Sequence, residues 1–224
     1  MSVWAVLAAA GRGERLGSDR PKAFARLGGR PLLAESLERL EGSGWIDFIV
    51  IAAPAEWEEP AILLAEELGA GKVSSVVTGG ASRSESVREA LAEVADDAAV
   101  VLVHDAARPL LPDDVIERVL APLSEGWDGV VPGLPVSDTV KRVEGERVVE
   151  TLPRGELVAV QTPQAFIASV LREALAGDVS AASDCASLVE ARGGRVKVVE
   201  GDPRLLKVTS AEDLALLETW LAPS

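Results

Sequence analysis

Short apolar runs alternate with amphipathic segments along the chain, and this alternation constrains the possible folds more than any other feature of the sequence. The apolar runs cover residues 3–7, 48–52, 73–77, 100–103, 129–131 and 196–199. They consist mostly of consecutive Val, Ile and Leu residues, a pattern typical of strands that are buried on both faces. Strands that alternate with helices predict an α/β fold with a doubly wound, mostly parallel, Rossmann-like sheet.

Seven further segments have apolar residues at helical spacing. They cover residues 32–40, 56–68, 84–94, 113–120, 168–175, 186–191 and 211–221. With 224 residues, of which 48% are hydrophobic, the chain is long enough to form one core, and we expect a single domain over residues 1–224. Ligands of such sheets bind beyond the carboxyl ends of the strands, so functional residues are expected in the segments that follow them.

Residues 137–160 interrupt the alternation. Two polar segments with β-forming residues, 139–143 and 147–151, lie on either side of a glycine turn at Gly145 and predict a hairpin. We expect a projecting β-arm over about residues 134–160. Such an arm buries little of its own surface, so we expect it to pack on a second subunit of a homodimer. An edge hairpin folded back on its own sheet is the alternative.

Composition excludes several classes of protein. The net charge of −14 argues against nucleic-acid binding, which requires a basic face. The first ten residues lack the basic start of a signal peptide, and no apolar run approaches the length of a membrane span. We therefore expect a cytoplasmic protein with no membrane partner. Cys185 is the sole cysteine, which excludes an internal disulfide and a cysteine-rich metal site.

Residues 7–22, LAAAGRGERLGSDRPK, lead from the first apolar run into a segment rich in glycine and arginine that ends on Lys22. The first thirty residues carry a local net charge of +4 within an acidic chain. Glycine lets the backbone approach a ligand closely, and arginine and lysine bind phosphate oxygens. These residues predict a nucleotide-phosphate loop; a surface turn between a strand and a helix is the alternative.

The spacing of this loop differs from two better-known phosphate motifs. The dinucleotide fingerprint requires a glycine where Leu16 stands. A Walker A loop requires glycine before the lysine and Ser or Thr after it, whereas Pro21 and Ala23 flank Lys22. An NAD-linked oxidoreductase is therefore disfavoured.

Residues 78–86, TGGASRSES, follow the third predicted strand. Two glycines followed by hydroxyl side chains at the start of a helix suit backbone contacts to a base or a sugar. Ser82 and Glu85 also have the spacing of a helix capping box, which would explain the segment without a ligand.

Asp105 follows the fourth predicted strand and is placed to hold Mg²⁺, which prefers one or two carboxylates together with substrate phosphates. Arg108 is expected to bind a second phosphate. His104, the only histidine, is expected to be a packing or orienting residue, and no proton transfer is assigned to it. With Lys22 and Lys207, basic residues follow the first, fourth and last strands around one carboxylate, which predicts phosphoryl or nucleotidyl transfer.

Six motifs, in this order and spacing, resemble those of the 2-C-methyl-D-erythritol 4-phosphate cytidylyltransferase family. They are LAAAGRGERLGSDRPKAF, TGGASRSESV, VHDAARPL, SDTVKR, QTPQAF and LLKVTSAEDL. The first motif alone indicates only the wider sugar-nucleotidyltransferase superfamily, whereas HDAARP and the DTVKR-to-TPQ arm are specific. The resemblance implies an enzyme of non-mevalonate isoprenoid biosynthesis. Such an enzyme joins CTP to 2-C-methyl-D-erythritol 4-phosphate, giving 4-diphosphocytidyl-2-C-methyl-D-erythritol and diphosphate.

The resemblance also implies a role for individual residues. The catalytic cations would be Arg15, Lys22 and Lys207. The nucleotide would contact Ala9, Ala10, Gly11, Gly80 and Ser86, and Asp105 would bind Mg²⁺. The sugar-alcohol phosphate would contact Arg108, Thr139, Arg154, Thr162 and Ser183, with Thr139 and Arg154 supplied by the arm of the second subunit.

One departure from the family pattern concerns the metal. The family often has Asp-Asn where this chain has Arg204-Leu205, which leaves Asp202 as the candidate for a second metal carboxylate. Two other functions stay open at this point. A pentitol-phosphate cytidylyltransferase, acting for example on ribitol 5-phosphate, would differ in the acceptor pocket, and a nucleotide-binding regulator would lack catalysis.

Overall fold

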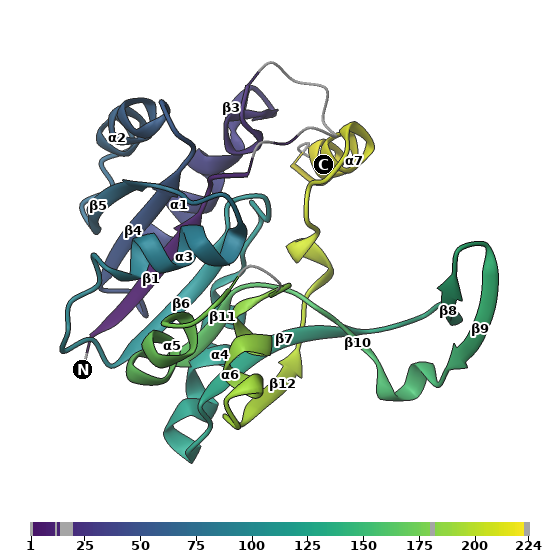
Figure 1. Ribbon diagram of the computed structural model, residues 1–224. Helices are drawn as coiled ribbons and strands as arrows, with labels where there is room; N and C mark the ends of the chain where they lie inside the picture. The colour runs from purple at the N-terminus through teal and green to yellow at the C-terminus, as the bar shows by residue number, and fades with distance from the viewer. Residues whose placement is uncertain (1, 12, 14–19, 180–181, 222–224) are drawn as a thin grey trace.

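The computed structural model describes residues 2–11, 13, 20–179 and 182–221. Within these ranges the core is an eight-stranded sheet in the order β10-β7-β11-β6-β1-β4-β5, with β12 paired to β7 (Figure 1). The six predicted strands are present as β1 (Val3–Ala8), β4 (Phe48–Ala53), β5 (Val73–Thr78), β6 (Val100–Asp105), β7 (Gly129–Pro135) and β12 (Val196–Glu200). Two strands of this sheet were not predicted, β10 (Val158–Val160) and β11 (Gln164–Ile167).

The sheet is mostly parallel, as predicted. Strand β1 runs parallel to both β4 and β6, and β5 runs parallel to β4. Strand β11 lies antiparallel between β6 and β7, so β7 points in the same direction as β6, and β12 is parallel to β7. The two unpredicted strands are therefore the antiparallel ones, since β10 is also antiparallel to β7.

All seven predicted helices are present. They are α1 (Leu32–Gly42), α2 (Glu58–Glu67), α3 (Arg83–Leu91), α4 (Asp113–Leu120), α5 (Ala168–Leu175), α6 (Cys185–Ala191) and α7 (Ala211–Leu221). Short elements complete the fold: β2 (Arg26–Leu27), β3 (Arg30–Pro31), η2 (Lys22–Phe24), η3 (Ala121–Glu125), η4 (Arg154–Glu156) and η5 (Pro203–Leu205). Within the described ranges, no helix has both the length and the apolar character needed to cross a membrane.

Helices cover both faces of the sheet. Buried residues of α1, α2 and α4 form one apolar cluster with the sheet, and buried residues of α3, α5 and α6 form another. Alternate residues of β1 enter the two clusters, with Ala5 and Leu7 in the first and Trp4 and Val6 in the second. Burial on both faces explains why the strand sequences are continuously apolar, because each face contributes its own hydrophobic stabilisation.

The strand register brings several carboxyl ends to one edge of the sheet. Ala8, at the end of β1, lies opposite Ala52 of β4 and Asp105 of β6. Ala53 lies opposite Thr78, the last residue of β5. The loops after β1, β5 and β6 therefore start side by side, which is where the sequence predicts functional residues.

The arm is a two-stranded sheet of its own, formed by β8 (Val140–Glu144) and β9 (Arg147–Leu152), and it projects from the core (Figure 1). Gly145 has a φ of 59° in the connecting turn. Within the described part of the chain, neither arm strand pairs with the main sheet, so the folded-back edge hairpin is wrong. Val143 and Val148 on the arm are 56% and 53% exposed.

Candidate active site

A cavity of about 580 Å³ lies at the carboxyl edge of the parallel strands, within the range of pockets that hold small molecules. Its lining comes from the loops after β1, β5 and β6 and from the segment before α7. The described lining residues are 8–11, 13, 22, 23, 80–83, 86, 105–107, 207 and 209. Strand ends that are far apart in sequence thus share one pocket.

Most of the predicted nucleotide and catalytic residues line this pocket. They are Ala9, Ala10, Gly11, Lys22, Gly80, Ser86, Asp105 and Lys207. Arg15, the third predicted catalytic cation, lies outside the described residues. The predicted acceptor residues are not among the residues that line this cavity; they are Arg108, Thr139, Arg154, Thr162 and Ser183.

The loop after β1 closes tightly at Lys22. The backbone N–H of Lys22 donates to the carbonyl of Gly11 at 3.2 Å. Gly13 has a φ of 73°, and a Cβ at that position would lie 2.7 Å from the Cβ of Lys22. Glycine is therefore required at position 13 both by conformation and by space, and this close approach holds the lysine at the pocket.

The loop after β5 packs against the loop after β1 through Gly79. A Cβ at residue 79 would lie 2.3 Å from the Cβ of Ala10. Helix α3 then starts with the predicted capping box, in which Ser82 Oγ accepts from the Glu85 N–H and the Glu85 carboxylate accepts from the Ser82 N–H. Ser86 Oγ donates to the Ser82 carbonyl at 2.8 Å. The capping box and the pocket lining thus occur in the same segment.

The carboxylate of Asp105 joins three segments of the pocket. Its Oδ1 accepts a hydrogen bond from Arg83 Nε at 2.7 Å, and its Oδ2 accepts one from Lys207 Nζ at 2.6 Å. Asp105 is only 5% exposed. Burial raises the pKa of a carboxyl group, but the positive charges of Arg83 and Lys207 lower it by more, and the pKa of Asp105 lies well below its usual range. The side chain is therefore ionised at neutral pH.

A chain of hydrogen bonds fixes the backbone around Asp105. The Asp105 N–H donates to Thr162 Oγ1 at 3.1 Å, and Thr162 Oγ1 lies 3.2 Å from His104 Nδ1. His104 Nε2 lies 3.0 Å from the carbonyl oxygen of Arg108, which only accepts, so Nε2 carries the proton and Nδ1 accepts from Thr162. His104 is fully buried, and burial lowers its pKa to about 4. It is a neutral, orienting residue, as expected.

Arg108 acts on the segment that carries Lys207. Its Nη1 donates to the carbonyl of Leu205, and the N–H of Val208 donates to the carbonyl of Ala107 at 2.8 Å. Within the described part of the chain, Arg108 Nε is buried without a hydrogen-bond partner. The loop after β6 therefore sets the path of residues 205–208 and brings Lys207 to Asp105.

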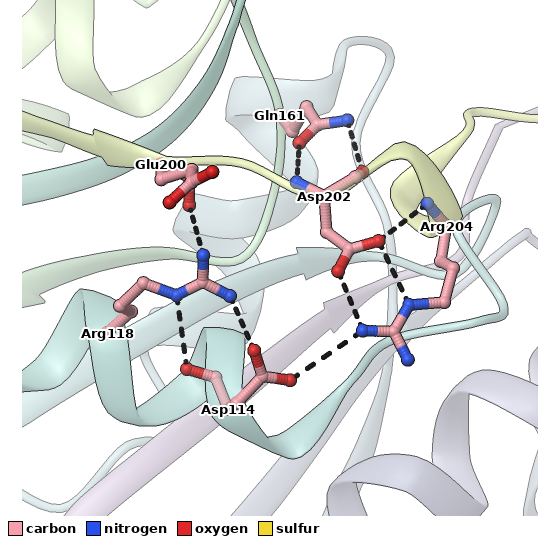
Figure 2. A network of polar contacts seen from close by, with 6 residues as sticks. All are labelled: Asp114, Arg118, Gln161, Glu200, Asp202 and Arg204. Carbon is pink, nitrogen blue, oxygen red and sulfur yellow. Dashed lines mark hydrogen bonds and ion pairs between the residues drawn. The ribbon is translucent and has the colours of Figure 1, made fainter.

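A second polar network fixes the start of the same segment (Figure 2). The Gln161 side chain bonds both the N–H and the carbonyl of Asp202, and the Asp202 carboxylate accepts three hydrogen bonds from Arg204. Asp202, the candidate for a second metal carboxylate, is thus paired with Arg204 and does not line the pocket. Among the described residues there is no cluster of three or more His, Cys, Asp or Glu that could hold a metal.

Arg83 is a site residue that the sequence analysis missed. It lines the pocket and bonds Asp105 directly. The available signal was its position after the third strand, since the basic residues chosen as candidates also follow strand ends. The prediction for the TGGASRS segment rests on its glycines and hydroxyl groups and assigns no role to its arginine.

These features define an α/β protein whose pocket, at the carboxyl edge of a parallel sheet, combines a glycine-containing loop, two lysines and an ionised carboxylate. That combination is typical of the nucleotide-phosphate-binding class.

Comparison with known proteins assigns the family. The family model for IspD, 2-C-methyl-D-erythritol 4-phosphate cytidylyltransferase, matches residues 3–222. The protein of that name from Nocardia farcinica is 49% identical over 221 residues, which cover 98% of this chain and 94% of that protein. The protein of that name from Saccharopolyspora erythraea is 48% identical over 226 residues, which cover 99% of this chain and 100% of that protein. The crystal structure of the 2-C-methyl-D-erythritol 4-phosphate cytidylyltransferase from Thermus thermophilus matches this structure with a TM-score of 0.77. The two sequences are 36% identical, and the match covers 96% of this chain and 97% of that one. The chain belongs to this IspD family.

The buried histidine predicts a pH dependence of stability. Because the folded pKa of His104, about 4, lies below its ordinary value of 6.5, the unfolded chain binds more protons between these values, and stability falls as the pH drops. We expect a loss of about 1 kcal/mol between about pH 7 and about pH 5.5. Urea unfolding at a series of pH values, without divalent metal, measures this change in the free energy of unfolding. His104→Gln should remove most of this slope; an equal slope in the variant would contradict the assignment.

Proposed function

We propose that this chain transfers the cytidylyl group of CTP to 2-C-methyl-D-erythritol 4-phosphate and releases diphosphate, a step of non-mevalonate isoprenoid biosynthesis. The observation that carries the proposal is the pocket in which Lys22, Lys207 and the ionised Asp105 meet, in a chain of this family. The relatives reported above are named for methylerythritol phosphate, so a pentitol phosphate such as ribitol 5-phosphate is not favoured as the acceptor.

The chemistry requires no general base. The phosphate of the acceptor is already an anion near neutral pH. One of its oxygens would attack the α-phosphorus of CTP; a new P–O bond forms there, while the bond to the β-phosphate breaks and diphosphate leaves. Catalysis of such a step consists of positioning and charge neutralisation. Lys22 and Lys207 line the pocket and would supply positive charge to the phosphate oxygens, and Arg15 is proposed to share this role.

The nucleoside would bind through the two loops that meet at Gly79. Both present backbone groups and small side chains to the cavity, at residues 9–11 on one loop and at Gly80 on the other. The Ser86 hydroxyl donates its proton to the Ser82 carbonyl and keeps its acceptor lone pairs. Small side chains leave room for a base and a ribose, and backbone groups supply hydrogen bonds to them.

We also propose Mg²⁺ as the cofactor, and the donor set of the pocket fits it. Asp105 is ionised, and each of its carboxylate oxygens keeps a lone pair beyond its one hydrogen bond. Mg²⁺ is commonly bound by one or two carboxylates together with substrate phosphates, so one carboxylate is sufficient. Asp105 would hold the ion, which would help to neutralise the triphosphate.

The arm supports a proposal of a homodimer. Thr139 and Arg154 are exposed, and the arm that carries them projects away from the core of its own chain (Figure 1). Exposed Val143 and Val148 give the arm an apolar surface. In a cytoplasmic homodimer, the arm of a second copy would bring both residues to the acceptor side of the pocket, beside Arg108 and Ser183 of the first.

Diphosphate release tests the proposed function. Purified protein with CTP and Mg²⁺ is expected to release diphosphate when 2-C-methyl-D-erythritol 4-phosphate is added, and to stay at background with ribitol 5-phosphate or without an acceptor. Release only with ribitol 5-phosphate would assign the chain to the sister activity. Absence of release with either acceptor would overturn the proposal.

Lys22→Ala and Lys207→Ala are each expected to lower kcat at least about a hundredfold, because one positive charge at the reacting phosphates is worth on the order of 3 kcal/mol. Lys197→Ala is the matched control, since Lys197 pairs with Glu125 and does not line the pocket. Circular dichroism checks that the variants fold. A folded variant within tenfold of wild-type turnover would remove that lysine from the mechanism.

A further inference from the structure

Arg83 and Lys207 hold opposite oxygens of the same buried carboxylate. Arg83 is the first residue of α3, and its Nε lies 2.7 Å from Asp105 Oδ1, while Lys207 Nζ lies 2.6 Å from Oδ2. The Arg83 side chain is 21% exposed and that of Lys207 is 38% exposed. Arg83 is therefore the more enclosed of the two cations, and Lys207 is the one that reaches farther toward solvent.

The terminal nitrogens of the Arg83 guanidinium face the protein interior. Nη1 donates to the buried thiol of Cys185 at 3.7 Å, at the start of α6. Nη2 is buried and has no hydrogen-bond partner within the described part of the chain. The guanidinium is planar and rigid. The side chain starts from the first residue of α3, where the capping box fixes the backbone. Arg83 therefore presents Nε to Asp105 from a fixed position.

Lys207 has no comparable rigidity of its own. Its ammonium is carried on four methylene groups and rotates freely about them. The contact with Asp105 Oδ2 restricts the position of Lys207 Nζ in the pocket. That position therefore depends on the orientation of the Asp105 carboxylate. Without the bond from Arg83, Asp105 would be free to turn, and Lys207 would be its main remaining counter-charge. Lys207 Nζ would then move with the Asp105 carboxylate instead of staying beside the phosphate oxygens.

We propose that Arg83 is a positioning residue for the cytidylyl transfer: it fixes the carboxylate of Asp105, which in turn holds Lys207 Nζ at the reacting phosphates. This inference rests on the proposed function, because it assigns to Lys207 the charge neutralisation described above. It gives the arginine of the TGGASRS segment a role that acts through two other side chains.

A double-mutant cycle tests the proposal. Arg83→Gln is expected to lower kcat at least about tenfold, since a small displacement of a reacting group costs one to two orders of magnitude, with the KM for CTP within about threefold of wild type. In a Lys207→Ala background the same substitution is expected to cost several-fold less than in the wild-type background, because Lys207 is already absent and only the effect on Asp105 itself remains. Arg88→Gln, an exposed position on the same helix, is the control and should leave kcat unchanged.

A fallback variant and two further measurements complete the test. If Arg83→Gln does not fold, the cycle is run with Arg83→Lys, which keeps the charge near Asp105 but lacks the planar fork; kcat should fall here too. Calorimetric titration of CTP without metal should give the same affinity for the Arg83 variant as for wild type. In a crystal structure of the Arg83 variant, Lys207 Nζ should have moved from its wild-type position.

Equal fold-losses from Arg83→Gln in the wild-type and Lys207→Ala backgrounds would overturn the positioning role, and so would an unmoved Lys207 in the crystal structure. These outcomes differ from failure of the proposed function, in which wild-type protein releases no diphosphate with either acceptor. In that case the crystal structure alone decides whether Arg83 positions Lys207.

Discussion

The pocket depends on one buried carboxylate and its two cations. Asp105 lies at the end of β6, and its partners Arg83 and Lys207 are 22 and 102 residues away in sequence. A buried charge that loses a partner is strongly destabilising, whereas a fully paired one is tolerated. The start of α3, the end of β6 and the segment before α7 therefore have one favourable arrangement, and the cavity lies between them. The function proposed for the chain depends on this arrangement, because it collects positive charge at a single place in a protein with a net charge of −14.

The sheet supplies the frame for this contact. Parallel register places Ala8 beside Asp105, so the loop that carries Lys22 and the carboxylate emerge at the same edge. Close packing between loops then requires residues without side chains, at Gly13 and Gly79. The hydrogen bonds of Arg108 to Leu205 and of Gln161 to Asp202 direct the last segment toward the pocket. The strand ends that belong to the fold therefore also determine where the pocket residues lie.

Local patterns in the sequence predict the helices, the longer strands of the main sheet and a helix cap, because short-range residue spacing determines these features. Continuous apolar runs and helical spacing predict the six longer strands of the main sheet and all seven helices, and the capping box at Ser82 follows from two residues three apart. Strand β11 was missed because it is four residues long, follows Pro163, and owes its antiparallel place to pairing with β6 and β7. Lys22, Asp105 and Lys207 are predictable because they follow strand ends. Arg83 pairs with Asp105, 22 residues away, through a three-dimensional contact that residue spacing does not reveal. Asp202 and Arg204 are only two residues apart, and their pairing is local.

The central claim is that the charges of Arg83 and Lys207 outweigh burial at Asp105, and NMR of the side chain tests it directly. The protein would carry ¹³C-labelled aspartate, with the Asp105 signal assigned by its loss in Asp105→Asn. Between about pH 7 and about pH 4.5 the carboxyl shift of Asp105 should stay at the value of an ionised group. A protonation midpoint within that window is what burial without two paired cations would produce, and it would contradict this account.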